Sequence, residues 1–348
     1  MGGTAGGTAK GILEQAVRTY WPNYSGIPEA GAKGWNNTTR FVEHEGSKYV
    51  LRVYETHREP DRILFEHEVL LHLAEAGLTF RTPVPQSGLD GSTLVRLEDG
   101  SGRYACLFGY IDGTRPADED RRPLRAFGQA AGELSAALSR IETRLTPAYR
   151  PYYELEQAYP LCTPERVAAF GSGSGLPAGL SGVEPELGHL SAVYREILQQ
   201  TDKLRHLPHQ LVHGDLNASN MLIRTGEPDT IEALLDFEFC TYDVRAMEAA
   251  VLLSGLPRWE RGLPDPMALC GDGFRRHAPL EAAEIEAVPL LMRLRKVDVF
   301  LHFLTRYWEG TDGIEVLGEQ ILSLSGDLKR MDEEEAELLR RLTRILSN

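Results

Sequence analysis

Residues 211–238 combine carboxylate, amide and imidazole side chains at a spacing that can support group-transfer chemistry. The side chains concerned are those of His213, Asp215, Asn220 and Asp236. Oxygen ligands without cysteine suit a hard cation, and Mg²⁺ in particular takes one or two carboxylates together with phosphate oxygens. A second carboxylate near such a cation can orient a hydroxyl group and accept its proton, which is the arrangement that phosphoryl transfer needs. The segment therefore predicts a phosphoryl-transfer site.

The elements around this segment must bring Asn220 and Asp236 together. We expect short strands at 221–224 and 231–235 with a turn at 226–229 between them. Paired positions of an antiparallel hairpin have a constant sum, so Asn220 and Asp236 should face each other across its open end. Asp215 lies in the loop just before Asn220. Three oxygen-bearing side chains are therefore expected to converge.

A structural role is the alternative, because Asp and Asn are common turn and cap residues. The pattern His-x-Asp-x-x-x-x-Asn also arises by chance in roughly 2% of chains this rich in His. A hydrophobic strand that ends in Asp-Phe at the mirrored hairpin position makes such an accident much rarer. We therefore favour catalysis.

The segment resembles the catalytic loop and metal-binding triplet of the aminoglycoside phosphotransferase, choline kinase and homoserine kinase-like group, which shares the protein-kinase fold. The triplet here is Asp236-Phe237-Glu238, and the resemblance extends from about Gly31 to about Leu253. It implies that Asp215 is the catalytic base, that Asn220 and Asp236 hold Mg²⁺, and that ATP is the phosphoryl donor. Glu238 stands where protein kinases have a glycine.

The resemblance also implies a basic residue on the third strand, paired with a glutamate on a helix. Arg52 occupies that place, where protein kinases usually have lysine, and it shares a strand face with Val50 and Tyr54. A charge among apolar neighbours is costly unless it meets an anion, although an edge-strand arginine can also reach water. Glu66 lies amid apolar positions of its predicted helix and is the expected partner. Glu68 is the alternative.

Two further segments resemble nucleotide contacts of the same group. The turn at 31–39 resembles the phosphate-covering turn, which implies ATP contacts at Gly34 and Asn37. The segment 104–113 resembles the strand and hinge whose backbone meets the adenine. Its candidates are Gly109, Tyr110 and Ile111. An ordinary turn and an ordinary buried strand would have the same patterns.

The order of the predicted elements indicates a small β-rich N-terminal lobe and a large α-rich C-terminal lobe, and the resemblance implies an α+β, bilobal, protein-kinase-like fold. Residues 1–10 are Gly-rich and expected to be disordered. Residues 11–112 would form the ATP-binding sheet with one prominent helix, and residues 113–348 the helical lobe with the catalytic loop and acceptor site. Predicted elements include a β-hairpin at 38–54 and helices at 11–20, 60–77, 124–138, 190–203, 245–253, 282–308, 314–324 and 333–346.

Composition excludes several classes of protein. The 348 residues carry a net charge of −14, which repels phosphodiester backbones and argues against nucleic-acid partners. No apolar run approaches the roughly 18 residues that a membrane helix needs, and the Gly/Thr/Ala-rich start is unlike a signal peptide. Four scattered cysteines are typical of reduced core thiols. We therefore expect a cytoplasmic protein, and the sequence does not indicate its oligomeric state.

Together these features predict an ATP- and Mg²⁺-dependent kinase of a small hydroxylated molecule. Candidate acceptors are homoserine or another amino alcohol, an aminoglycoside, a choline-like molecule or a sugar. No Ala-Pro-Glu activation segment follows Asp236, which argues against protein substrates. The alternative is a catalytically silent nucleotide-binding or spore-coat-type structural protein on the same fold.

Overall fold

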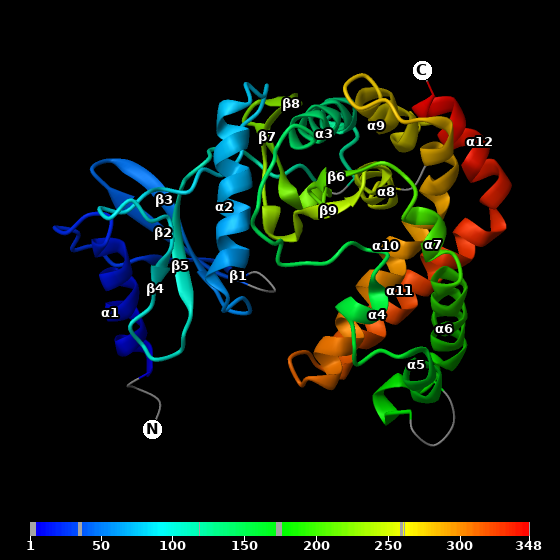
Figure 1. Ribbon diagram of the computed structural model, residues 1–348, viewed down its shortest axis with the longest axis horizontal. Coiled ribbons are helices and arrows are strands. Elements are labelled where there is room, and N and C mark those ends of the chain that lie inside the picture. Colours follow the sequence, from blue (N-terminus) through cyan, green and yellow to red (C-terminus); the bar gives the residue numbers. More distant parts are fainter. Residues whose placement is uncertain are drawn as a thin grey trace. The chain divides into compact units, whose positions relative to one another are not determined.

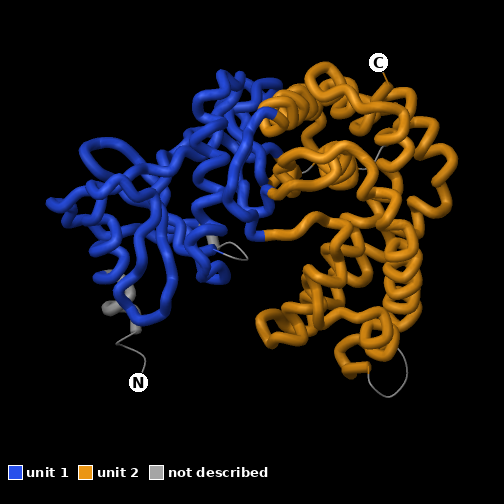
Figure 2. Tube along the Cα trace, in the orientation of Figure 1, with its two compact units in different colours: residues 1–116, 140–148, 220–240 blue, residues 117–139, 149–219, 241–348 orange. Residues whose placement is uncertain are grey.

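The computed structural model describes residues 5–33, 37–117, 119–171, 176–257, 260 and 262–347 of the chain. The secondary structure is mixed, with antiparallel strands followed mainly by helices, so the predicted α+β class is confirmed (Figure 1). The chain forms two compact units (Figure 2). Unit 1 contains residues 1–116, 140–148 and 220–240, and unit 2 contains residues 117–139, 149–219 and 241–348. The first break falls close to the boundary expected at residue 112.

Unit 1 is built on an antiparallel sheet with the strand order β1-β2-β3-β5-β4 among the described residues. Its elements are α1 (Ala5–Arg18), β1 (Glu29–Lys33), β2 (Asn37–His44), β3 (Ser47–Tyr54), α2 (Pro60–Glu75), β4 (Val95–Arg96) and β5 (Tyr104–Gly109). Strands β2 and β3 form the predicted hairpin, and its turn residues Glu45 and Gly46 have φ angles of 49° and 79°. Two left-handed residues match the twist of a tight hairpin. The sheet therefore fixes Arg52 of β3 between β2 and β5.

Helix α1 begins at Ala5, inside the stretch 1–10 that the sequence favoured as disordered. Ala9 and Lys10 have high helix propensity and extend a helix that is anchored further along. Its anchors Ala16 and Val17 are buried against the sheet. The helix therefore starts before the apolar pattern that marks it in the sequence.

Helix α2 matches the prediction closely. Pro60 opens it, where a missing amide hydrogen costs nothing, and Gly77 follows its end with a φ of 70°. Its buried apolar residues are Ile63, Phe65, Val69, Leu70 and Leu73. Glu66 and His67 are buried among them, which sets two polar side chains on the face that packs inward.

The hairpin β7 (Met221–Arg224) and β8 (Glu227–Leu234) belongs to unit 1 although it lies late in the sequence. Thr114 exchanges two backbone hydrogen bonds with Ile223, and Arg81 donates to Glu232 and accepts from Leu234. These backbone contacts attach the hairpin to the chain around residues 81 and 114. The sequence division into 11–112 and 113–348 did not include this return of the chain.

The register of this hairpin differs from the prediction. The turn lies at Thr225 and Gly226, where Gly226 has a φ of 84°, rather than at 226–229. The pairing shifts on either side of Ile223, and the Leu235 amide donates to the Asn220 carbonyl at 2.8 Å. A bulge adds a residue on one strand, so the constant-sum rule fails. Asn220 therefore lies opposite Leu235, one residue from the expected Asp236.

Unit 2 is helical around a small two-stranded sheet of β6 (His209–Val212) and β9 (Thr241–Val244). The helices are α3 (Leu124–Leu138), α4 (Leu155–Ala158), α5 (Pro164–Phe170), α6 (Glu184–Leu198), α7 (Thr201–Leu204), α8 (Ala246–Ser254), α9 (Pro266–Phe274), α10 (Ala282–Trp308), α11 (Ile314–Glu333) and α12 (Glu335–Leu346). Gly128 lets α3 approach α9 closely, because a Cβ there would overlap the backbone of Cys270. No helix of the described residues is long and apolar enough to cross a membrane.

The predicted ranges of α3 and α10 match the structure, and two other helices differ. The expected helix at 190–203 is divided into α6 and α7 around Gln199. Helix α11 continues nine residues beyond its expected end at Leu324. Ser325 and Gly326 resemble a helix end, but Leu328 is fully buried one turn further on and holds the helix together.

The buried His67 predicts a pH dependence of the stability of unit 1. Its Nε2 lies 3.0 Å from the Tyr54 hydroxyl and its Nδ1 lies 2.7 Å from the Thr93 hydroxyl. Burial lowers the pKa of His67 to about 3, with Arg52 adding to the effect. The unfolded chain then binds the extra proton between pH 6.5 and 3, so stability is lost as the pH falls through that window. The expected loss between pH 7 and pH 4 is roughly 3 kcal/mol.

Urea unfolding of the parent and of His67→Gln at pH 7 and pH 4 measures this contribution. The parent should lose more stability on acidification than the variant does. His72→Gln is the control, because His72 is an exposed residue of the same helix. Equal losses in the parent and in His67→Gln would show that His67 is not kept neutral by the fold.

Candidate active site

Arg52 joins strand β3 to helix α2 through the predicted ion pair. Its Nη1 donates to Oε1 of Glu66 at 2.8 Å, and Glu66 is only 5% exposed. The alternative partner is wrong, because Glu68 accepts a hydrogen bond from the Thr143 hydroxyl instead. The guanidinium also lies 5.4 Å from the centre of the Phe108 ring. Arg52 is therefore held on two sides before any ligand binds.

The second anion beside Arg52 is Asp236. The Arg52 Nη2 and the Asp236 Oδ1 are 3.5 Å apart. Asp236 has a φ of 66°, a left-handed conformation that costs a non-glycine residue roughly 1–2 kcal/mol. This strain lies at the residue that the family resemblance implies as a metal ligand, and strained backbone of this kind is typical of functional sites.

Glu238 and Asn37 complete the group in unit 1. The side-chain amide of Asn37 donates to Glu238 Oε2, and His57 Nε2 lies 3.7 Å from Glu238 Oε1. Glu238 is 5% exposed. Asn37 was predicted as a phosphate contact, and in the structure its side-chain amide binds Glu238. Glu238 and His57 were not predicted as site residues, although a carboxylate two residues after Asp236 was a signal for the former.

Negative charge exceeds positive charge around Arg52. Burial raises the pKa of Glu66 to about 7, against the lowering effect of Arg52, and Glu238 and Asp236 raise it further. Burial alone would lower the pKa of Arg52, but the carboxylates of Glu66 and Asp236 raise it above its usual value. The Arg52 guanidinium is therefore shared by two carboxylates, those of Glu66 and Asp236, with a third, Glu238, close enough to affect its pKa. Such an excess of negative charge suits a divalent cation.

The donor set at the hairpin fits a cation that is completed by phosphate oxygens. Asn220 is 7% exposed at the start of β7, and Asp236 follows the end of β8. No group of three His, Cys, Asp or Glu side chains gathers as a metal site among the described residues. One amide and one carboxylate are enough for Mg²⁺ when a nucleotide supplies further oxygens.

The remaining predicted nucleotide contacts have different outcomes. Gly34 lies outside the described residues. The Gly109 amide donates to the Val84 carbonyl at 3.3 Å, and the Tyr110 amide donates to the Lys48 carbonyl at 3.1 Å. These two amides therefore already have backbone partners at the end of β5. An adenine bound at this segment would therefore have to meet the Ile111 amide or carbonyl groups.

In unit 2, the loop that carries Asp215 is anchored through its backbone. The His213 amide donates to Glu248 Oε2 at 2.6 Å, and the Tyr152 hydroxyl donates to the Gly214 carbonyl at 2.6 Å. Burial raises the pKa of Glu248 to about 7, and the amides of His213 and Gly214 oppose that rise. Gly214 has a φ of 78°, which places Asp215 directly after a left-handed turn. The backbone of the loop is therefore fixed at Gly214, the residue immediately before Asp215.

Asp215 itself forms an ion pair that the sequence did not indicate. Its Oδ1 accepts from Nη2 of Arg295 at 2.6 Å, and both side chains are 17% exposed. Arg295 lies on α10, eighty residues after Asp215. No local pattern distinguishes this arginine from others on the same helix.

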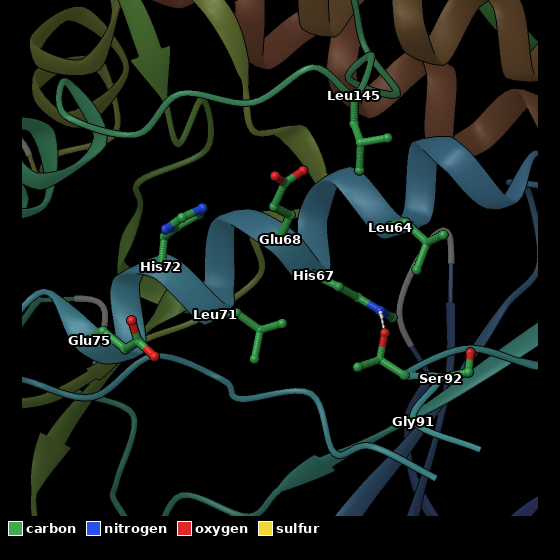
Figure 3. A pocket seen from close by; sticks show the side chains of 10 residues that line it. Leu64, His67, Glu68, Leu71, His72, Glu75, Gly91, Ser92 and Leu145 are labelled. Carbon is green, nitrogen blue, oxygen red and sulfur yellow. Dashed lines mark hydrogen bonds between the residues drawn. The ribbon is translucent and has the colours of Figure 1, made fainter. Parts of the chain in front are cut away.

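The cavity found in unit 1 lies elsewhere, on the other face of α2 from Glu66. It has a volume of about 520 Å³. Figure 3 shows Glu68, His72 and Glu75 of α2 at its wall, with Leu145 across from the helix. None of the predicted site residues that the structure describes lines it. The cavity therefore gives no information about the reaction.

Comparison with known proteins identifies the class to which this fold and site belong. The model of the phosphotransferase enzyme family (APH) matches residues 29–283, and the chain belongs to that family. The match includes Arg52, Glu66 and the whole catalytic segment. The protein is a small-molecule kinase that acts on a hydroxyl group. This outcome favours the enzyme over the non-catalytic alternative.

Curated relatives include homoserine kinases. The homoserine kinase of Rhodopseudomonas palustris is 26% identical over 276 residues, which are 78% of this chain and 75% of the relative. The homoserine kinase of Sinorhizobium fredii is 27% identical over 295 residues, or 82% and 79% of the two chains. The resemblance identified from the sequence is therefore confirmed.

Solved structures share the fold at low sequence identity. An amicoumacin kinase in complex with AMP-PNP, Ca²⁺ and Ami has a TM-score of 0.65 and 17% identity, and 91% of this chain and 93% of that chain are covered. A microcompartment-associated aminopropanol kinase has a TM-score of 0.65 and 18% identity, with 96% and 99% covered. These likenesses establish the kinase-like fold.

Proposed function

We propose that this protein transfers the γ-phosphate of ATP to the hydroxyl group of homoserine or a closely related amino alcohol, in a Mg²⁺-dependent reaction. The observation that carries the proposal is the group of Arg52, Glu66 and Asp236, in which one guanidinium is shared by two carboxylates. A guanidinium held in this way can bind the phosphates of a nucleotide. The carboxylates outnumber it, so they can also bind a divalent metal ion.

The residues of unit 1 would bind the nucleotide. Arg52 contacts the phosphates, and Glu66 fixes its guanidinium. Asn220 and Asp236 are the proposed Mg²⁺ ligands, and bound Mg²⁺ would neutralise charge on the phosphate oxygens. Asn37, at the start of β2, would contact the phosphates, and the segment from Gly109 to Ile111 would meet the adenine. The amicoumacin kinase of similar fold is bound to AMP-PNP and Ca²⁺, which supports a nucleotide and a divalent cation.

Asp215 would act on the acceptor. Its carboxylate accepts a hydrogen bond from the acceptor hydroxyl and takes the proton as the hydroxyl oxygen forms a bond to the γ-phosphorus. The bond between that phosphorus and the bridging oxygen of ATP breaks, and ADP leaves with the electron pair. Such transfer is loose and needs orientation and charge stabilisation more than a strong base. The products are ADP and the phosphate ester.

Release of ADP, measured in a coupled assay, tests both the reaction and the acceptor. Homoserine, other amino alcohols, choline-like molecules, aminoglycosides and sugars are supplied in turn with ATP or GTP, with Mg²⁺ or with EDTA. We expect the fastest release with homoserine or an amino alcohol, and none in EDTA. Faster release with an aminoglycoside or a sugar would contradict the acceptor that we propose, and release in EDTA would contradict the metal.

Arg52→Met is expected to raise KM for ATP and to lower the thermal stability of the nucleotide-free protein. Removal of one partner of a buried ion pair typically costs about 3–5 kcal/mol. Without Arg52, the buried Glu66 loses the cation that lowers its pKa, so its carboxyl group must either stay charged without a partner or take up a proton. Arg52→Lys should keep part of the activity, since the charge survives while the planar fork does not. Steady-state kinetics and thermal unfolding give the two readouts.

Arg103→Met is the matched control for this pair. Arg103 also pairs with carboxylates in unit 1, Glu55 and Asp99, but it lies nearer the surface. Its loss should change stability little and KM for ATP not at all. If Arg52→Met bound ATP as the parent does, Arg52 would not be a phosphate contact.

A further inference from the structure

Arg295 occupies a costly position for a structural arginine. It projects from the middle of α10 and is mostly buried, and its guanidinium carbon lies 5.5 Å from the centre of the Tyr152 ring. Burial opposes its charged form, yet Tyr152 and two carboxylates raise its pKa above the usual value. A guanidinium is kept in such a place only when well-oriented anions satisfy it.

The two anions differ in their surroundings. Nη2 donates to Asp215 Oδ1 at 2.6 Å, and Nη1 donates to Asp298 Oδ2 at 3.1 Å. Asp298 in turn accepts from the Tyr159 hydroxyl at 2.8 Å. The planar fork of arginine is therefore fixed at one end by Asp298. This leaves the other end of the guanidinium, Nη2, in a defined orientation toward Asp215.

The loop that carries Asp215 supplies no lysine or arginine to that carboxylate. Residues 213–220 include neither lysine nor arginine. Asp215 therefore receives its positive neighbour from a distant helix. A carboxylate on a loop can rotate about its χ2 torsion, and a hydrogen bond to one oxygen removes that freedom.

We propose that Arg295 is a positioning residue for the reaction: through its hydrogen bond to Oδ1 it fixes the plane of the Asp215 carboxylate, and Asp298 and Tyr159 hold Arg295 in place. The inference rests on the proposed function, because it assigns Arg295 its effect through Asp215. Positioning of this kind acts on kcat, since misplacement of a catalytic group by about 1 Å can cost on the order of 10²-fold in rate.

Three variants test the inference: Arg295→Met, Arg295→Lys and the double variant Asp215→Asn with Arg295→Met. ADP release with homoserine gives kcat and both KM values. We expect Arg295→Met to lower kcat about 10–10²-fold with KM for ATP nearly unchanged, and Arg295→Lys to recover part of the loss. Arg295→Met should cause no further loss in the Asp215→Asn background, because residues that act as a unit are not additive.

Arg293→Met is the matched control. Arg293 lies on the same helix, is also 17% exposed, and also pairs with two carboxylates, Glu196 and Asp332. Residues two positions apart on a helix point to different faces, so Arg293 does not contact the catalytic loop. Its variant should keep the kcat of the parent. Thermal unfolding of every variant shows which of them remain folded.

The outcomes separate this inference from the proposed function. A kcat for Arg295→Met equal to that of the Arg293→Met control would overturn the inference. So would equal losses in Arg295→Met and Arg295→Lys that add fully to the loss in Asp215→Asn, because these would indicate a structural contact only. If homoserine is not phosphorylated, the acceptor is wrong, and the same comparisons are made on the acceptor that the screen identifies. A normal kcat for Asp215→Asn would refute the role of Asp215 itself.

Discussion

Asp215→Asn is expected to lower kcat for phosphoryl transfer by about 10²–10⁴-fold, the usual effect of losing a positioned acid or base group. An amide keeps the size of the side chain and can still accept a hydrogen bond from Arg295, but it cannot take the proton of the acceptor hydroxyl. Asp215 belongs to unit 2, whereas Arg52, Asn220 and Asp236 belong to unit 1. The affinity for Mg·ATP should change little, because Asp215 is not among the proposed nucleotide and metal contacts.

Single-turnover kinetics and calorimetric titration of Mg·ATP measure the two effects separately. Asp332→Asn is the control, because Asp332 is also an aspartate paired with an arginine of α10, and it lies away from the catalytic loop. It should leave both quantities unchanged. A near-normal kcat in Asp215→Asn would remove Asp215 from the chemistry, and a loss of Mg·ATP affinity alone would assign it to nucleotide binding.

The ion pair of unit 1 was predictable because two periodicities mark it. Arg52 shares the face of a strand with apolar residues, and Glu66 shares the inward face of a helix with others. Each position is unfavourable for a charge alone. The structure confirms that the two charges meet, and that Glu68, which lies two residues further along the helix, has a different partner.

The β7–β8 hairpin shows where the constant-sum rule for paired positions fails. Its strands and its place before Asp236 were predictable from hydrophobic runs, but its register was not. Bulges beside Ile223 and the tight turn at Gly226 arise from backbone geometry that no side-chain pattern records. The left-handed backbone conformation of Asp236 likewise could not be predicted from the pattern of side chains.

Arg295 was not predictable from the sequence at all. Helix α10 also carries Arg293 and Arg306, and nothing in their spacing indicates which of them contacts the catalytic loop. Only the packing of α10 against α8 and the loop at Gly214 selects Arg295. The sequence does not indicate the acceptor for the same reason, because its binding would depend on side chains brought together by helices distant in sequence.

Asp236→Ala is expected to abolish Mg²⁺-dependent nucleotide binding, and Asn220→Ala should weaken it less. A carboxylate offers a hard cation a full charge, and an amide offers only a dipole. Alanine is disfavoured at the φ of 66° found at Asp236, so backbone strain adds to the effect of that variant. Asp236→Asn avoids this difficulty, because asparagine tolerates left-handed backbone and retains one oxygen ligand.

Calorimetric titration of ATP with Mg²⁺ and with EDTA into each variant isolates the contribution of the metal. We expect the affinity to decrease in the order parent, Asn220→Ala, Asp236→Asn, Asp236→Ala, and the difference between Mg²⁺ and EDTA to decrease in the same order. Asp229→Ala, at an exposed position on the same hairpin, should match the parent. Because Arg52 keeps its bond to Glu66 in all these variants, a weak metal-independent affinity for ATP should remain. Equal Mg²⁺ dependence in Asp236→Asn and the parent would mean that the charge beside Arg52 serves the arginine rather than a metal.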